Sequence, residues 1–144
     1  KIAQVRGGAK DIDGAIEEYR VIVGLDEGNV VALNNLAWYL LERNPEEALT
    51  HAQKAFGLSP ESSSVLDTLA MAQLATERLP EARRTIDRAL ELSPDSPELM
   101  YHEARIRLAE GDSAGAAQSL AAVLAQHDSF YERDKAVALL EELH

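Results

Sequence analysis

The feature that most constrains the fold is an internal repeat. The stretch EEALTHAQKAFGLSPES at 46–62 aligns with PEARRTIDRALELSPDS at 80–96. Ala48 and Ala82 occupy the same place in these two stretches, 34 residues apart, and Ala116 follows after another 34 residues. A repeat of this length predicts supersecondary units that cannot bury an apolar face alone and therefore stack on their neighbours around a continuous core.

Each repeat unit is expected to form two helices. Alanine is frequent, and apolar residues recur at three- and four-residue steps, as at Leu33, Leu36 and Leu40. The prolines fall between such runs, where a helix has to stop. The predicted helices cover 12–24, 29–43, 45–57, 62–77, 80–92, 97–110, 113–126 and 130–143, and residues 1–8 are expected to be the remnant of an earlier helix.

The repeat resembles that of the tetratricopeptide repeat family, whose units of about 34 residues form helix–turn–helix pairs. The matching positions are the small residue of the second helix, at Ala15, Ala48, Ala82 and Ala116, and the closing proline, at Pro60 and Pro94. The resemblance implies an all-α fold, a right-handed superhelical solenoid of antiparallel helix pairs with a C-terminal capping helix. Its parts are expected at 1–29 (a truncated first repeat), 30–62, 63–96, 97–128 and 129–144 (the capping helix).

Three sequence segments point to a particular group within this family: NNLAWYLLE, SSVLDTLAMAQL and PELMYHEARIRLAEGD. They are similar to phrases in bacterial repeat lipoproteins associated with exopolysaccharide, PEP-CTERM and exosortase systems. The chain departs from those proteins where Ala70 and Met71 replace a Gly-Trp pair and where Glu103 replaces a leucine. The resemblance implies a scaffold of the periplasm or cell envelope. The same phrases occur in generic bacterial repeats, so a cytoplasmic location stays open.

The charge balance disfavours nucleic acid as a partner. Lys and Arg number 14 against 25 Asp and Glu, which gives a net charge of −11 and repels phosphate backbones. The absence of cysteine excludes disulfides and thiolate metal sites. No apolar run approaches the length of a membrane span. Because the chain begins at Lys1, we expect a fragment of a longer protein, attached to a membrane only through parts outside it.

The resemblance also implies that the first helix of each unit lines a concave groove that binds a protein or peptide. The residues expected to bind the partner are Asn34, Asn35, Trp38, Asp67, Thr68, Met71, Glu98, Tyr101, His102 and Arg105. Trp38 and Tyr101 offer flat apolar area with polar tips, and Arg105 could bind a carboxylate. In the alternative interpretation, Trp38 and Met71 only pack against neighbouring helices and the polar groups are solvated.

The pair His102-Glu103 matches the start of the zinc-protease motif H-E-x-x-H. The second histidine of that motif is replaced by Ile106, so two ring nitrogens cannot meet at one ion. We therefore interpret His102 as a structural or surface residue. No catalytic residue, metal site or cofactor is predicted, no small-molecule substrate is expected, and the protein is expected not to be an enzyme.

Glu103 is the unusual residue of this segment, because the family keeps a buried leucine at its position. A buried carboxylate has to be paired or protonated. We expect a cation beside it, either Arg107 or a residue of the last helix such as Arg133 or Lys135.

The function expected from the sequence is a non-enzymatic protein–protein interaction scaffold. The alternative is a structural or self-associating segment of a longer superhelix. Such a segment would form a homodimer through its open N-terminal edge or its last helix.

Overall fold

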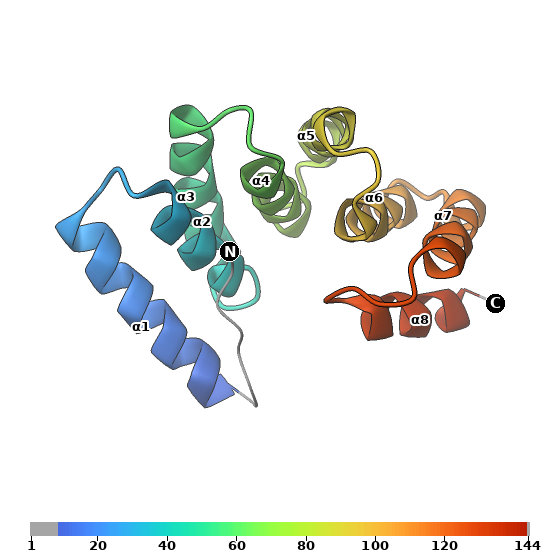
Figure 1. The fold of residues 1–144 in the computed structure, drawn as a ribbon, viewed down its shortest axis with the longest axis horizontal. Helices are drawn as coiled ribbons and strands as arrows, with labels where there is room; N and C mark the ends of the chain where they lie inside the picture. Colours follow the sequence, from blue (N-terminus) through green and yellow to red (C-terminus); the bar gives the residue numbers. More distant parts are fainter. Residues whose placement is uncertain (1–8, 144) are drawn as a thin grey trace.

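The structure, a computed structural model, describes residues 9–143. These residues form eight helices and no strand: α1 (Ala9–Leu25), α2 (Val30–Leu40), α3 (Pro45–Leu58), α4 (Ser63–Ala75), α5 (Leu79–Leu92), α6 (Pro97–Ala109), α7 (Ser113–Gln126) and α8 (Arg133–Glu142). The helices follow an arc with α1 at one end and α8 at the other (Figure 1). Every predicted helix is present with ends within three residues of those expected. The helix remnant expected at 1–8 lies outside the described residues.

Side-chain caps explain where several helices begin. A side-chain oxygen at the residue before the helix accepts an N–H from the first turn, which satisfies a donor that the helix itself leaves unpaired. The residues that do this are Asn29, Asn44, Ser62, Ser96 and Asp112. Pro45 and Pro97 follow such caps in the first turn, where the missing N–H of proline costs nothing.

The helix pairs are held together by small residues that allow close approach. Ala48, Ala82 and Ala116 are completely buried, each in the second helix of its pair. Larger side chains such as Leu36 and Ile86 fill the space between successive pairs. The all-α solenoid of antiparallel pairs expected from the repeat is therefore confirmed.

The last helix closes the apolar core at the C-terminal end. Ala136 of α8 is completely buried in one cluster with Tyr101 of α6 and Leu120 of α7, and Leu140 packs against that cluster. The connection from α7 doubles back, so that α8 begins below α6 and runs below α7 in this view (Figure 1). Across residues 9–143, no helix has both the length and the hydropathy that crossing a membrane requires.

Candidate functional site

A cavity of about 470 Å³ lies against the first helices of the three pairs, α2, α4 and α6. Its volume falls within the usual range of ligand sites. Three further parts complete it: the first turn of α1, the turn that follows α2, and residues 131–135, called here the start of α8. The lining residues are Ile12, Trp38, Tyr39, Leu41, Glu42, Arg43, Met71, Ala75, Tyr101, Arg105, Tyr131, Glu132 and Lys135.

One repeat position of each first helix contributes a large side chain to the lining. Trp38, Met71 and Arg105 occupy equivalent positions in successive repeats. The Arg105 guanidinium lies 5.8 Å from the centre of the Tyr101 ring, and its Nη1 is 3.5 Å from the sulfur of Met71. A cation is thus held against an aromatic ring and a thioether, an arrangement that favours Arg over Lys.

Tyr39 lines the cavity with a side chain whose hydroxyl is buried. Its side chain is 7% exposed, and its buried hydroxyl has no hydrogen-bond partner among residues 9–143. Burial, together with the neighbouring Tyr19 and Tyr131 phenols, raises the pKa of Tyr39 to about 12. The hydroxyl therefore stays protonated near neutral pH, and it lies in the packed core rather than on the open surface of the cavity.

Four of the ten residues predicted to bind a partner line the cavity: Trp38, Met71, Tyr101 and Arg105. Met71 is also part of the buried core, so the packing interpretation holds for this residue. Trp38 is only partly buried and packs against two core clusters. The other six predicted residues are Asn34, Asn35, Asp67, Thr68, Glu98 and His102, and they do not line the cavity.

Besides His102, three of those six are buried and bonded within the solenoid. Asn34 donates from Nδ2 to Ser64 Oγ at 3.1 Å, and Asn35 donates from Nδ2 to the Tyr19 hydroxyl at 3.2 Å. Thr68 donates to the carbonyl of Ser64 in the preceding turn at 3.2 Å. The two asparagines join neighbouring helices, a role that repeat position alone does not reveal.

His102 is completely buried and connects three elements. Its Nδ1 is 2.6 Å from Asp67 Oδ1 of α4, and its Nε2 is 2.5 Å from Glu132 Oε1 at the start of α8. Tyr131, next to Glu132, donates its backbone N–H to Glu98 Oε2 at 3.4 Å. The expected position of His102 on an open groove is thus corrected. The start of α8 covers it, and both ring nitrogens are bonded to carboxylates.

The two carboxylates keep the imidazole charged. Burial by itself would lower the pKa of His102, but the attraction and hydrogen bonds of Asp67 and Glu132 outweigh it and raise the pKa to about 9. Burial would raise the pKa of Glu132, yet the hydrogen bond to His102 and the nearby cations lower it. His102 is therefore an ion-paired structural residue that fixes α8 against α6.

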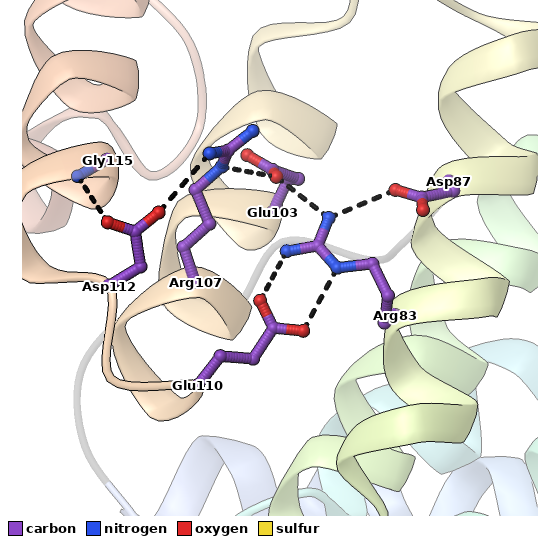
Figure 2. Close-up of polar contacts among 7 residues, drawn as sticks. All are labelled: Arg83, Asp87, Glu103, Arg107, Glu110, Asp112 and Gly115. Atoms are coloured by element: carbon purple, nitrogen blue, oxygen red, sulfur yellow. Dashed lines mark hydrogen bonds and ion pairs between the residues drawn. The ribbon is translucent and has the colours of Figure 1, made fainter.

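Glu103 is buried and paired, as predicted. Arg107 Nε lies 2.6 Å from Glu103 Oε2, and Arg83 Nη1 of α5 lies 2.9 Å from the same oxygen. Figure 2 shows Arg83 between Glu103, Glu110 and Asp87. The predicted partner Arg107 is confirmed, whereas the suggestions from the last helix are wrong. Arg133 donates to backbone carbonyls at the end of α7, and Lys135 lies beside Glu132.

Several residues of the cavity were not predicted from the sequence. Tyr131, Glu132 and Lys135 follow the last repeat, so no repeat position assigns them to the groove. Tyr39 lies next to Trp38, and helix periodicity alone would turn it away from the groove. The available signal was weak: a tyrosine and two charged residues at the start of a helix that otherwise carries apolar residues.

Comparison with known proteins supports the same fold. Residues 39–99 match a family model described as tetratricopeptide repeat. The chain is similar to TTC0263, a thermophilic repeat protein of Thermus thermophilus, at 20% identity and a TM-score of 0.81, covering 93% of this chain and 73% of that one. It is also similar to MamA, at 21% identity and a TM-score of 0.68, covering 93% and 87%.

A third similar structure is that of PilF from Pseudomonas aeruginosa, at 27% identity and a TM-score of 0.65. The match covers 88% of this chain and 57% of PilF. No curated protein matches the sequence. Residues 39–99 therefore match the tetratricopeptide repeat family, and the chain shares the fold of these repeat structures.

Proposed function

We propose that this tetratricopeptide repeat protein is a scaffold that holds a segment of a partner protein in the cavity between α2, α4, α6 and α8. Proteins of this family are generally non-enzymatic scaffolds for protein–protein interaction. The observation that carries the proposal is the cavity itself. It combines half-buried Trp38 and exposed Tyr131 with the Arg105 guanidinium, and the first helix of every complete pair contributes to it.

The lining has the composition of a binding hot spot. Tryptophan, tyrosine and arginine dominate the energetics of protein interfaces because each combines large contact area with directed polar groups. Trp38, Tyr131 and Arg105 supply all three types around one cavity. Asn34, Asn35, Asp67 and His102 support this proposal indirectly, because their hydrogen bonds join the helices that carry the lining to their neighbours. Thr68 is bonded within its own helix.

The test fills the cavity without disturbing the core. Ala75 is exposed, lies at the last position of α4 and lines the cavity. Ala109 is exposed at the equivalent position of α6 but does not line it. Peptides would be selected from a random library on the wild-type protein, and their binding to Ala75→Trp and Ala109→Trp would be measured by calorimetry.

We expect Ala75→Trp to weaken the selected peptides at least about tenfold and Ala109→Trp to leave their affinity near that of wild type. Helical circular dichroism should be unchanged in both variants. Equal affinity for all three proteins, or a library that gives no binding peptide, would overturn the proposal.

We further propose that the scaffold acts in a bacterial cell-envelope or exopolysaccharide system. The support is the resemblance of the phrases around Trp38, Asp67 and Tyr101 to repeat lipoproteins of such systems. Fractionation of the source cells tests this directly. Recovery of the full-length protein in the envelope fraction is expected, and recovery in the cytosol alone would contradict it.

A second candidate function is self-association through α1. Val21 and Leu25 lie one turn apart on α1 and are 59% and 84% exposed, whereas the apolar residues of α8 pack against α7. This difference favours the N-terminal edge over the last helix as a contact with a second copy. Light scattering would support it if the mass of the wild type rises to that of a dimer with increasing concentration while Leu25→Glu keeps the mass of a monomer. A monomer at all concentrations would contradict it.

A further inference from the structure

The start of α8 forms one wall of the cavity. Tyr131 is 63% exposed, yet it lines the cavity together with Glu132 and Lys135. Capping an apolar core requires only the buried face of α8, around Ala136 and Leu140. The contribution of Tyr131 and Lys135 to the cavity is therefore additional to the capping role.

This wall is held in place by specific bonds. Glu132 is anchored on the buried His102, and the backbone of Tyr131 is bonded to Glu98. Arg133 donates to the carbonyls of His127 and Leu124 at 3.1 and 3.3 Å, which fixes the direction of the connection that precedes α8. The wall is thus ordered before any ligand arrives, which lowers the entropic cost of binding.

The apolar lining favours a large side chain as ligand. The Arg105 guanidinium lies 5.8 Å from the centre of the Tyr101 ring and 3.5 Å from the Met71 sulfur. Trp38 and Tyr131 extend the same lining. An aromatic side chain gains most from such a site, through burial and through contact with sulfur and guanidinium groups.

The charges of the lining favour one carboxylate beside that side chain. Three cations, Arg43, Arg105 and Lys135, stand against two carboxylates, Glu42 and Glu132, so the lining carries +1 on a chain of −11.

The availability of these cations differs. The Glu132 carboxylate is already bonded to the charged His102, and Arg43 is paired with Asp13. Arg105 contacts the Met71 sulfur and the Tyr101 ring and is attracted to Glu132 from a distance, but no carboxylate among the described residues forms an ion pair with it. Lys135 makes only a long ion pair of 3.7 Å, with Glu132. Arg105 and Lys135 can therefore bind a further carboxylate.

We propose that the start of α8 is part of the partner site, and that the cavity accepts an aromatic side chain next to an Asp or Glu side chain whose carboxylate binds Arg105 and Lys135. This inference rests on the proposed function and adds to it the chemistry of the partner segment. A strongly acidic segment would be repelled by the chain as a whole, so a single carboxylate in an otherwise neutral stretch fits best.

The test uses defined peptides with acetylated and amidated ends, so that only a side-chain carboxylate is present. One peptide carries a central Glu-Phe pair among glycine and serine, and the matched peptides carry Gln-Phe and Glu-Gly. Binding is measured by calorimetry to wild type, Arg105→Gln, Lys135→Gln and Tyr131→Ser. The controls are Arg84→Gln and Lys54→Gln, since both residues are exposed and neither lines the cavity.

We expect the Glu-Phe peptide to bind wild type about tenfold more tightly than either matched peptide. The preference for Glu over Gln should disappear in Arg105→Gln and shrink in Lys135→Gln, while both controls keep it. Tyr131→Ser should weaken the Glu-Phe peptide.

Equal binding of the Glu-Phe and Gln-Phe peptides, or no measurable binding of any of the three, would overturn the inference. So would wild-type behaviour of Lys135→Gln and Tyr131→Ser together, both of which change exposed side chains and leave the core intact. If library-selected peptides still lose affinity in Ala75→Trp, the proposed function stands while the inference fails. If Ala75→Trp has no effect on library-selected peptides and the Glu-Phe peptide shows no preference, the cavity is rejected as a partner site.

Discussion

At the scale of single residues, Arg83 is the centre of the largest ionic network among the described residues. It binds Glu103 of α6, Glu110 after α6 and Asp87 of its own helix (Figure 2). The hydrogen bond to Glu110 is the main cause that raises the pKa of Arg83, with Glu103 and Asp87 adding to it and burial opposing it. Glu103 is buried and has two cation partners, Arg83 and Arg107. If Arg83 is removed, water cannot take its place beside the buried carboxylate.

We predict that Arg83→Leu lowers the free energy of unfolding by about 2 kcal/mol, less than for a fully buried pair because Arg107 remains bonded to Glu103. Urea denaturation followed by circular dichroism measures the change. Arg88→Leu is the matched control on the same helix, since Arg88 forms exposed ion pairs with Glu61 and Glu91 and should matter little. Equal losses in the two variants would contradict the role given to Glu103.

The His102 network predicts how stability depends on pH. The pKa of His102 is higher in the folded protein than in the unfolded chain, so its charge stabilises the fold fully below about pH 6.5 and this contribution is lost as the pH rises through about 9. Glu132 acts in the opposite direction. Its lowered pKa gives stability above its ordinary value of 4.5 that is lost in more acidic solution.

Between pH 6 and 10, the wild type should therefore lose up to about 3 kcal/mol of unfolding free energy through His102. The variant His102→Gln should be less stable at pH 6 and should lack this decline. Urea titrations at a series of pH values give both curves. Parallel curves for the two proteins would rule out a charged His102 in the folded state.

The residues that sequence reasoning could identify are those linked by short spacing or by the repeat. Arg107 is one helical turn from Glu103, so their pairing followed from helix geometry. Trp38, Met71, Tyr101 and Arg105 followed from their repeat positions in the first helices. Arg83 is 20 residues before Glu103 on another helix, and Glu132 is 30 residues after His102 beyond the last repeat. Such pairs depend on how the helices pack, which no local pattern contains.

At the scale of elements, α4 and α6 end in the same turn with different residues. Arg78 N–H bonds to the carbonyl of Gln73, and Asp112 N–H bonds to that of Arg107, the pattern of a Schellman motif. The residue before each of those donors has positive φ. It is Glu77 with φ 62° after α4 and Gly111 with φ 92° after α6. A side chain is strained in this region, whereas glycine is not.

We predict that Glu77→Gly raises the free energy of unfolding by on the order of 0.5 to 1 kcal/mol, because the relief of left-handed strain exceeds the added entropy of glycine in the unfolded chain. The reciprocal change, Gly111→Ala, should lower it by a similar amount. Both follow from urea denaturation. A loss of stability in Glu77→Gly would show that its side chain supports the turn in some other way.

The last helix shows the limit of sequence reasoning about elements. Its apolar spacing predicted a capping helix at 130–143, and α8 is present there. The direction from which α8 approaches depends on the connection after α7, which Arg133 and Glu132 fix through their contacts with α7 and α6. The contribution of α8 to the cavity wall could therefore not be predicted from the sequence alone.

At the scale of the whole molecule, the repeat determines the arc and the arc creates the cavity. Each helix pair contributes its first helix to the same side, so Trp38, Met71 and Tyr101 come together from three separate repeats. The cavity lining is slightly positive, whereas the rest of the chain is strongly negative. A partner segment that is mostly neutral, with one carboxylate beside an aromatic residue, matches both the local site and the overall charge.

The most direct test of this account uses Trp38, the one tryptophan of the chain, as a reporter inside the cavity. Its fluorescence would be recorded while a library-selected peptide without tryptophan is added to the wild-type protein. We predict a saturable change in emission whose midpoint equals the dissociation constant from calorimetry. A peptide that binds by calorimetry and leaves the Trp38 emission unchanged would show that partners bind outside the cavity.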